Sequence, residues 1–472
     1  MKTIFTFLSL AWAGIVVAQH QEIGEQPGTY KGNTIQIADT ASILNAFKKG
    51  TVQGHFRYFF MNTINEGGLS DYFANAIGGG LKFETAIYHR LQIGISGFYV
   101  FNVGSSKLSD IDPITNQSNR YEIGLFDIEK PSNQKDIDRL EEFYINYHFK
   151  SGHIGLGRLL LNTPFINLQD GRMCPTSVEG LTSDSKLGKK TRLQAGWLWN
   201  ISPRSTTKWY GIGESIGLYP QGVSTSGIKS DYAGNLKTKN LFFLGTNSQF
   251  YKWLNVQFVD LYVDEVLNSA FLQVEAKKTI NERQSMTVGA QFIRQDAVEY
   301  GGNKDQSKTY MNQDSHSMVF GGKMEYKHKK STFSVNYTRI TADGRYLMPR
   351  EWGRDPFYTF MPRERNEGFG DVNAMVVKYN RPFPKSHFKI GLSAGYFDMP
   401  DVKNVALNKY GMPSYFQANA DLRYSFSKIL EGLDIQFLVI SKFNNGNYYN
   451  NYRYIINKTN MIQFDLVLNY HF

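Results

Sequence analysis

Five arginines lie within one short stretch of the chain, RYLMPREWGRDPFYTFMPRERNEG, at 345–368. Four acids, Glu351, Asp355, Glu364 and Glu367, lie among them. The stretch holds prolines and glycines but no apolar period, which predicts a loop. The guanidinium group of arginine binds a carboxylate through two N–H groups and stays charged at any physiological pH. Three interpretations fit such a loop: nucleic-acid binding, a salt-bridged surface, or the charged wall of a water-filled hole.

The elements that must position this loop are predicted to be β-strands. Apolar and polar residues alternate along many short runs, and clear examples are 52–60, 91–101, 141–149, 191–200, 331–338 and 415–426. A period of two places one apolar and one polar face on each strand. About seventeen such runs can be counted, and bacterial single-chain barrels have even strand numbers. We therefore expect an all-β, antiparallel transmembrane β-barrel of about 18 strands, with 16 as the alternative and a large soluble sandwich as the competing fold.

The two ends of the chain favour export to a membrane. Residues 1–18 have a positive start at Lys2, an apolar stretch and small residues before Gln19, which is typical of a removed secretory signal. We expect a signal peptide at 1–18, a short N-terminal segment at 19–50 and the barrel at 51–472. The chain ends in the alternating run MIQFDLVLNYHF, in which Val467 breaks the pattern. Tyr470 and the terminal Phe472 resemble the C-terminal signal that assembly machinery reads in bacterial outer-membrane barrels.

Composition excludes several other classes of protein. No apolar run after the signal approaches the ~20 residues of a spanning helix, so a helical membrane protein is excluded. Aromatic residues make up 15% of the chain, which fits a lipid-facing surface that alternates with a wet lumen. The net charge of +10 would be compatible with nucleic-acid binding. However, the chain has no zinc-finger spacing, basic helix or phosphate-binding glycine loop. A single cysteine, Cys174, cannot form an internal disulfide.

Connections of two lengths alternate along the chain. Short hinges at 88–92 and 149–153 are predicted to be tight periplasmic turns. Longer inserts near 104–138, 160–190, 201–237, 296–314 and 341–370 are predicted to be extracellular or inward-folded, constricting loops. This alternation is typical of outer-membrane barrels.

Two of these inserts carry a resemblance to a known family. The segments NTPFINLQDGRMCPTSVEG at 162–180 and REWGRDPFYTF at 350–360, with GHFRYFF in the first strand and GNL near Gly234, resemble the OprD family of outer-membrane porins. The resemblance implies an eighteen-stranded barrel with a narrow eyelet, inward loops, a ladder of basic residues and an opposing acidic patch. It also implies passive transport of small, water-soluble, usually carboxylate-bearing solutes without a cofactor.

Seven residues are candidates for the pore constriction. The resemblance assigns Arg172 to the constricting loop and places Arg354 and Asp355, of the GRDPFYT motif, at the eyelet. Asp170 and Asp355 are the acids expected to face the arginines and to orient zwitterions. Three further arginines are predicted from strand parity alone, because each lies on the polar face of its strand: Arg57, Arg192 and Arg423.

The function expected from these observations is a substrate-selective diffusion channel in the outer membrane of a Gram-negative bacterium. Its partners would be small-molecule solutes, outer-membrane lipid and the barrel-assembly machinery, but not nucleic acid, and the chain would be a monomer or a trimer. No catalytic residue, metal or cofactor is expected, because the histidines are scattered and neither a GxSxG nor an HExxH motif occurs. An adhesin or structural barrel, and a barrel hydrolase, are the alternatives. A plugged transporter is disfavoured because the first strand begins near Val52 and leaves no room for a plug domain.

Overall fold

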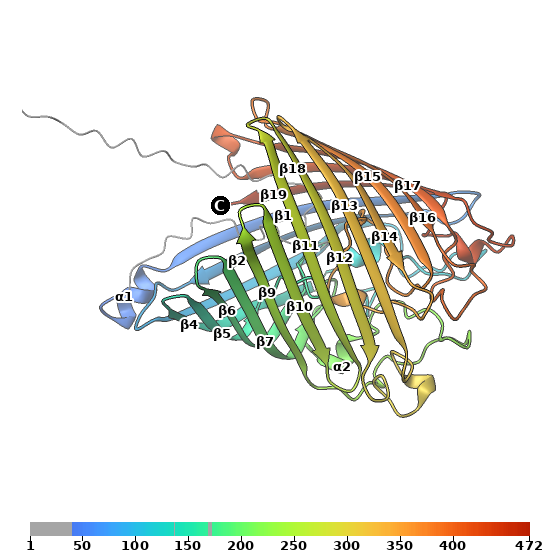
Figure 1. Cartoon of the computed structure of the whole chain (residues 1–472), viewed down its shortest axis with the longest axis horizontal. Helices are drawn as coiled ribbons and strands as arrows, with labels where there is room; N and C mark the ends of the chain where they lie inside the picture. The colour runs from blue at the N-terminus through green and yellow to red at the C-terminus, as the bar shows by residue number, and fades with distance from the viewer. Residues whose placement is uncertain (1–39, 136, 169–171) are drawn as a thin grey trace, which may run out of the picture.

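The computed structural model describes residues 40–135, 137–168 and 172–472. Within these ranges the chain forms eighteen long antiparallel strands and very little helix (Figure 1). The long strands are β1 (Thr51–Asn65), β2 (Tyr72–Glu84), β3 (Leu91–Ser105), β4 (Ile137–Phe149), β5 (Gly152–Leu159), β6 (Ser177–Leu187), β7 (Thr191–Ser202), β9 (Leu241–Tyr251), β10 (Leu254–Val263), β11 (Leu267–Asn281), β12 (Gln284–Ala297), β13 (His316–His328), β14 (Ser331–Ile340), β15 (Val372–Phe383), β16 (Phe388–Asp398), β17 (Tyr415–Ser425), β18 (Leu433–Asn444) and β19 (Met461–His471). Strand β8 (Tyr210–Gly211) is a two-residue addition beside β7.

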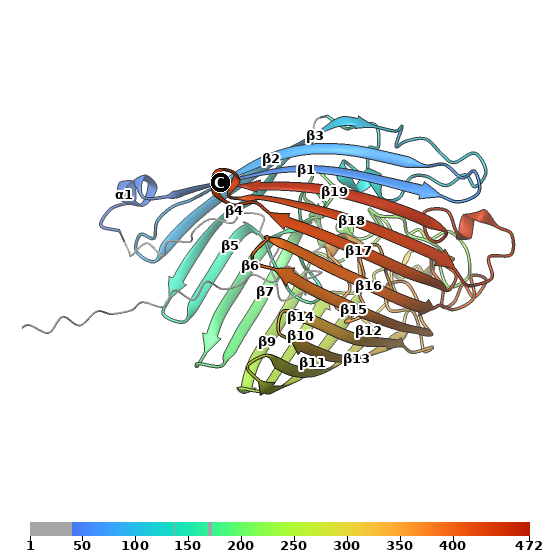
Figure 2. The same ribbon diagram turned by 90° about the horizontal axis from the view of Figure 1, so that it is seen from above.

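The sheet closes on itself, which confirms the predicted barrel. Each long strand pairs with its neighbour in sequence, and β1 pairs with both β2 and β19. Tyr58 of β1, for example, lies opposite Ile77 of β2 on one side and Leu468 of β19 on the other. Figure 2 shows β1 and β19, from the two ends of the chain, side by side. Closure removes both edge strands, so every long strand has two hydrogen-bonded neighbours.

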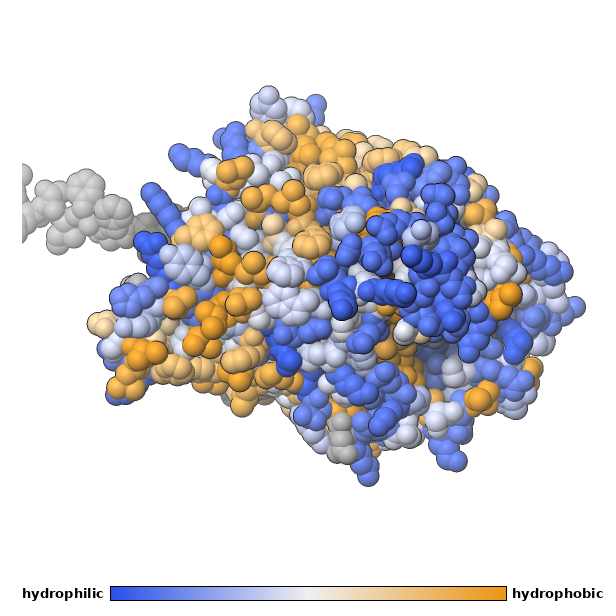
Figure 3. All heavy atoms as spheres, turned by 90° about the horizontal axis from the view of Figure 1, so that it is seen from below, coloured by the Kyte–Doolittle hydropathy of each residue, from blue (hydrophilic) through white to orange (hydrophobic). Residues whose placement is uncertain are grey.

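The period of two separates an outer from an inner face. On β19, Ile462 and Tyr470 are exposed while Gln463 and Asp465 are buried. Val467, which breaks the apolar–polar alternation, shares the inner face and is buried there. A space-filling view of one side shows apolar side chains gathered on the half nearer the N-terminal helix and hydrophilic ones on the half farther from it (Figure 3). Apolar residues therefore face outward over the barrel wall, as a lipid-facing surface requires.

Connections at one end of the barrel are short and those at the other end are long. Strands β4 and β5 are joined by 150–151, and β11 and β12 by 282–283. The two predicted hinges lie at this end, where His89 and Arg90 adopt positive φ angles in the β2–β3 turn. At the opposite end, long loops at 106–136, 160–176, 203–240 and 341–371 leave the wall.

The predicted layout has an insert at 160–190 that is too long, and it lacks the long loops at 399–414 and 445–460. Residues 177–187 form β6 instead, so the loop is shorter than predicted. The sequence SVEGLTSDSKL offers few apolar residues on its outward side, and its inward face carries Gly180, Thr182 and Asp184, so the alternating signal is weak. The count of seventeen runs falls one short because of this strand.

Short helices occupy the loops and the N-terminal end. They are α1 (Ile43–Lys48), α2 (Ile212–Ser215), η1 (Glu122–Leu125), η2 (Gln306–Lys308), η3 (Arg350–Trp352), η4 (Lys428–Leu430) and η5 (Tyr452–Tyr454). Helix α1 lies at the short-turn end, where the carbonyl of Ala46 accepts a hydrogen bond from the N–H of Ala86 (2.9 Å). Its Phe47 ring stacks on Phe83 of β2 at a centroid distance of 6.1 Å.

Candidate functional site

The loop at 341–371, which we call the inner loop, crosses the inside of the barrel. The hydroxyl of Tyr358 donates to the carboxylate of Glu275 on β11 (2.9 Å). Farther along the same loop, the Nη2 group of Arg363 lies 2.6 Å from Asp465 on β19. Strands β11 and β19 are eight places apart in the closed sheet, so a loop that contacts inward side chains of both must span the interior.

Two other loops pack against the inner loop and fix its backbone. In the 160–176 loop, the side chain of Asn167 accepts from the N–H of Arg354 (3.1 Å) and donates to its carbonyl (3.0 Å). In the 203–240 loop, the N–H groups of Gly217 and Tyr219 both donate to Oε1 of Glu351, at 3.0 and 2.9 Å. The three loops therefore form one hydrogen-bonded assembly inside the long-loop end of the barrel.

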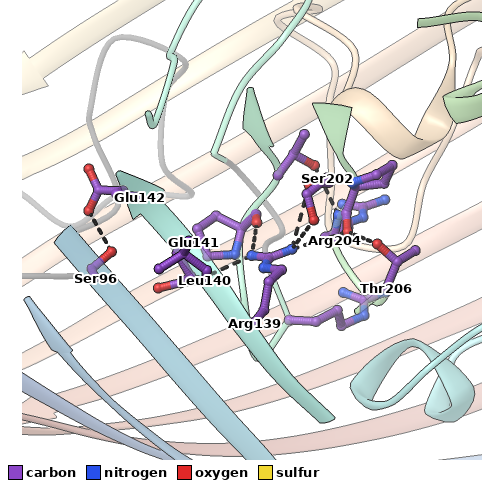
Figure 4. Close-up of polar contacts among 12 residues, drawn as sticks. Ser96, Arg139, Leu140, Glu141, Glu142, Ser202, Arg204 and Thr206 are labelled. Atoms are coloured by element: carbon purple, nitrogen blue, oxygen red, sulfur yellow. Dashed lines mark hydrogen bonds and ion pairs between the residues drawn. The ribbon is translucent and has the colours of Figure 1, made fainter. Parts of the chain in front are cut away.

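A buried arginine on the wall anchors the bases of these loops. Arg139 of β4 bonds to Glu141 (3.1 Å), to the carbonyl of Pro203 (3.2 Å) and to that of Pro175, which ends the 160–176 loop (Figure 4). The register between β3 and β4 shifts at this point. A β-bulge of this kind turns two consecutive side chains to the same face. Glu141 and Glu142 consequently both point inward, and Glu142 accepts from Ser96 (3.0 Å).

Cations from three loops form a connected series, which we call the basic row. It begins at the exposed Arg453, whose carbonyl accepts from the ammonium of Lys458 (2.8 Å). Lys458 also donates to the carbonyl of Tyr410 (2.9 Å), and the guanidinium of Arg350 lies over the Tyr410 ring at 5.0 Å. The carbonyl of Arg350 then accepts from Arg204, which is buried (3.2 Å). The row thus leads from the loop surface into the barrel.

Burial and neighbouring positive charges lower the pKa values of two cations in this region. Burial, reinforced by the positive charges of Arg120 and Arg453, lowers the pKa of Lys458 to about 7. Burial and the charges of Arg350 and Arg204 likewise lower the pKa of the Arg365 guanidinium. The positive charges of Arg120 and Arg365 thus add to that of the row. Such like-charge crowding favours binding of an anion, whose arrival would relieve the repulsion.

The acids of the inner loop lie behind the basic row and are buried. Glu367 accepts from the Tyr410 hydroxyl (3.0 Å) and lies 3.7 Å from Lys409 and 3.9 Å from Arg350. Burial raises the pKa of Glu364 to about 8, and the charge of Asp355 adds to the shift. These acids bind loop backbone and cations. The charged groups that remain partly exposed here are the arginines Arg350 and Arg365.

The structure brings two of the predicted residues together. Arg57 of β1 points inward, donates from Nε to Asn469 (2.7 Å), and donates from Nη1 to the carbonyl of Arg172. The Arg172 side chain lies against Gly124 of η1, because a Cβ at Gly124 would be 3.4 Å from its Nε. The wall and the 160–176 loop therefore meet at these two arginines. Asp170, the acid predicted beside them, lies outside the described residues.

Arg354 and Asp355 are adjacent in sequence but have different environments. The guanidinium of Arg354 lies over the Phe360 ring at 4.4 Å and lines a cavity of about 210 Å³ between the inner loop and the wall. Asp355 is 2% exposed, and its Oδ2 accepts from the N–H of Asn366 (3.2 Å). Burial accordingly raises the pKa of Asp355. The expectation that Asp355 faces a hydrated constriction is wrong, because its carboxylate is enclosed by the loop it stabilises.

Arg192 and Arg423 lie away from the loop assembly. Arg192 follows the β6–β7 turn and forms a bidentate pair with Asp184, while Arg423 near the end of β17 pairs with Asp421 (2.8 Å). Both point inward, as their strand parity predicts, but they lie near the short-turn end. The structure therefore does not place them at the constriction with Arg172 and Arg354.

The C-terminal residues complete the outer wall. The N–H of Phe472 donates to the carbonyl of Gly54 (3.1 Å), and the Gly54 N–H donates back to the carbonyl of Phe472 (2.8 Å). The Phe472 ring covers Gly54 so closely that any Cβ there would collide with it. Tyr470 and Phe472 are both exposed on the outer face, with ring centroids 5.7 Å apart.

Strand parity could not reveal most of the basic row. Arg350 and Arg365 lie in the charged stretch at 345–368, so composition alone points to them. Arg120, Arg204 and Lys458 lie in three other loops and are assembled by tertiary contacts. Three arginines of the charged stretch, Arg345, Arg354 and Arg363, prove to be buried. Arg345 donates to the backbone carbonyls of Ala406, Val223, Ser224 and Val405, and so joins loops to one another.

In the described ranges, no helix is long and apolar enough to cross a membrane. Over the same ranges, no three His, Cys, Asp or Glu side chains are grouped so that they could hold a metal ion.

Comparisons with known proteins identify the family. The model of the OprD family, described as outer membrane porins, matches residues 124–386. No curated protein sequence matches the chain. Similar solved structures include OccAB4 of Acinetobacter baumannii, at 16% identity and a TM-score of 0.69 over 91% of this chain and 99% of that one. OccK9 (OpdG) of Pseudomonas aeruginosa has 14% identity and a TM-score of 0.71, and OpdK of the same species, solved with vanillate, has 13% and 0.67; each comparison covers 90% of this chain and 99% of the other. The family match extends over more than half of the sequence, and the chain belongs to the OprD family of outer-membrane porins.

Proposed function

We propose that this porin is a passive channel selective for small carboxylate-bearing solutes, such as amino acids, small organic acids and short peptides. The observation that carries the proposal is the basic row, in which cations from separate loops follow one another into the barrel while the neighbouring acids are buried. A carboxylate that enters a narrow lumen loses water, and charged donors must replace that hydration. A series of moderate sites would hand the anion along and then release it.

The wall and loop arginines have distinct parts in this proposal. Arg350 and Arg365, which are partly exposed, would contact the passing carboxylate. Arg57 and Arg172 would extend the basic surface along β1. The vanillate found with the similar OpdK is itself an aromatic carboxylate, which supports this solute class for the present chain. Transport would need neither catalysis nor a cofactor.

A planar-bilayer experiment tests this function. Reversal potentials in a gradient of potassium acetate should show acetate preferred over potassium in the native channel. Arg350→Gln should lower this preference roughly tenfold, since a hydrogen bond to a charged group contributes about 1.5–3 kcal/mol. The change spares the Arg350 carbonyl that Arg204 binds.

A matched control removes a positive charge from elsewhere on the barrel. Arg294 of β12 alternates with the buried Ile293 and Gln295 along the strand and pairs with Asp296. Arg294→Gln should leave the acetate preference unchanged. An equal loss in both variants would show that net charge, rather than the basic row, sets selectivity, and a native channel without anion preference would refute the proposal.

A further inference from the structure

Four side-chain amides lie in one row across the inner wall of the barrel. Gln257 of β10 is the direct partner of Asn247 on β9 and of Gln273 on β11, and Gln273 is the partner of Gln291 on β12. We call these four residues the amide row. Neighbouring strands are ~4.8 Å apart, so the row extends over roughly 14 Å. All four have the inward parity of their strands and line the cavity of about 210 Å³ that Arg354 also lines.

The end of the row nearest the inner loop is fixed in orientation. The Nε2 of Gln291 donates to Oε1 of Gln273 (2.8 Å) and to the carbonyl of Pro356 (2.8 Å). Its Oε1 accepts from the N–H of Tyr358 (3.3 Å). These bonds direct the Nε2 group of Gln273 away from Gln291, toward the rest of the cavity.

The middle of the row offers hydrogen-bonding groups that the protein does not use. No hydrogen bond links the amide of Gln257 to any residue in the described part of the chain, and the same holds for Nε2 of Gln273. At the far end, Asn255 donates to Asn247 (2.7 Å), and Asn247 is exposed next to the β9–β10 turn. The row therefore presents open donors and acceptors to this cavity.

Charges at the edge of the cavity add a second kind of recognition. The Arg354 guanidinium, stacked on Phe360, and the Lys378 ammonium supply positive charge. Oxygen Oε1 of Glu275 is bound by Lys323 (2.6 Å) and by the Tyr358 hydroxyl (2.9 Å). A bare carboxylate would need only the cations. Primary amides, which both donate and accept, match neutral groups that do the same.

We propose that this cavity is a binding subsite for carboxylates that also carry several neutral hydrogen-bonding groups, either hydroxyls or amides. The inference rests on the proposed function and specifies its solute class: the carboxylate binds at Arg354 while Gln257 and Gln273 bind the hydroxyls or amides. The cavity is smaller than the ~300–1,000 Å³ of pockets that bind drug-sized ligands. It therefore limits the solute to about the size of a single sugar or a short peptide.

The test compares three monocarboxylates in planar bilayers through their half-saturating concentrations for blocking single-channel current. Gluconate supplies hydroxyls, triglycine supplies amides, and hexanoate supplies neither. Native channels should bind gluconate or triglycine at least about fivefold more tightly than hexanoate, as expected for one or two added neutral hydrogen bonds. The double variant Gln257→Leu, Gln273→Leu should remove that difference and leave hexanoate block unchanged.

The control uses the same substitution in another inner cavity. Gln194 of β7 also points inward, but it lines a different cavity and donates to Asp184 (3.1 Å). Gln194→Leu should retain native block by all three solutes. A loss confined to gluconate or to triglycine also supports the subsite and identifies the neutral group as hydroxyl or amide.

Three results would overturn the inference. They are equal native affinity for the three solutes, a double variant with native preferences, and an equal weakening of all three solutes in that variant. In each of these cases carboxylate block persists, so the proposed function survives. If none of the three solutes blocks the native channel, the carboxylate function fails together with the subsite.

Discussion

The arginines at the two ends of the barrel interior are held in different ways. Near the short-turn end, Arg192 pairs with Asp184 and Arg423 with Asp421, each arginine with an acid of the wall. At the long-loop end, Arg350 and Lys409 share the carboxylate of Glu367, which also accepts from Tyr410. A one-to-one pair is neutral, whereas two cations on one carboxylate leave a net positive charge. We infer that selectivity depends on how arginines are neutralised rather than on how many point inward.

The largest expected effect comes from breaking the buried pair that fixes the inner loop. Arg363→Met would leave the carboxylate of Asp465 buried beside Gln463 without its cation. Removing one partner of a buried pair costs about 3–5 kcal/mol. The urea midpoint of the folded barrel in detergent should fall accordingly, and a midpoint equal to that of the native protein would show that the loop does not depend on this pair.

A somewhat smaller loss should follow from removing the acceptor that joins two loops. Glu351→Leu leaves the buried N–H of Gly217 and the part-buried N–H of Tyr219 unpaired, and the buried group alone costs about 1–3 kcal/mol. Limited proteolysis should then cut the 203–240 loop faster. Glu214→Leu, in the exposed part of the same loop, is the control, and an equal rate of cutting in the two variants would argue against the acceptor role.

Anion selectivity should depend on pH through Lys458. Its pKa is lowered to about 7, so the ammonium is charged below pH 7 and loses its proton as the pH rises through that value. Acetate preference should therefore fall severalfold between pH 6 and pH 8. Glu364, whose pKa is raised to about 8, gains negative charge over the same range and acts in the same direction.

Lys458→Arg separates these two groups, because arginine keeps its charge throughout. The variant should retain most of its acetate preference at pH 8. If its pH profile matches that of the native channel, then Lys458 is not the titrating group, and Glu364 becomes the one to change.

The smallest effects are expected at the short-turn end. Arg192→Ala breaks a half-exposed pair, and such pairs contribute about 0–1 kcal/mol. Reversal potential and urea midpoint should both stay close to native values. A loss of anion preference as large as that of Arg350→Gln would remove the distinction between the two ends.

Local pattern predicted the wall of this barrel well and its interior less well. Alternation along single strands indicated about seventeen strands, which the even strand number of bacterial barrels raised to eighteen. It also indicated the inward direction of Arg57, Arg192 and Arg423, because side-chain direction in a strand follows from parity alone. The Arg423–Asp421 pair could also have been foreseen, since residues two apart share a face. By contrast, the basic row joins loops separated by hundreds of residues, and no periodicity records such contacts. Asp355 shows the same limit. Its motif predicted that it lies in the inner loop, but the burial of its carboxylate depends on the contact with Asn366 and on the surrounding loop.

The bond between Arg363 and the last strand also orders events during biogenesis. Two of its side-chain partners, Gln463 and Asp465, belong to β19, the strand that pairs with β1 and closes the sheet. The inner loop thus gains these two contacts only once β19 is in place. A chain truncated before residue 461 would lack both contacts, and its inner loop would be held by fewer strands of the wall.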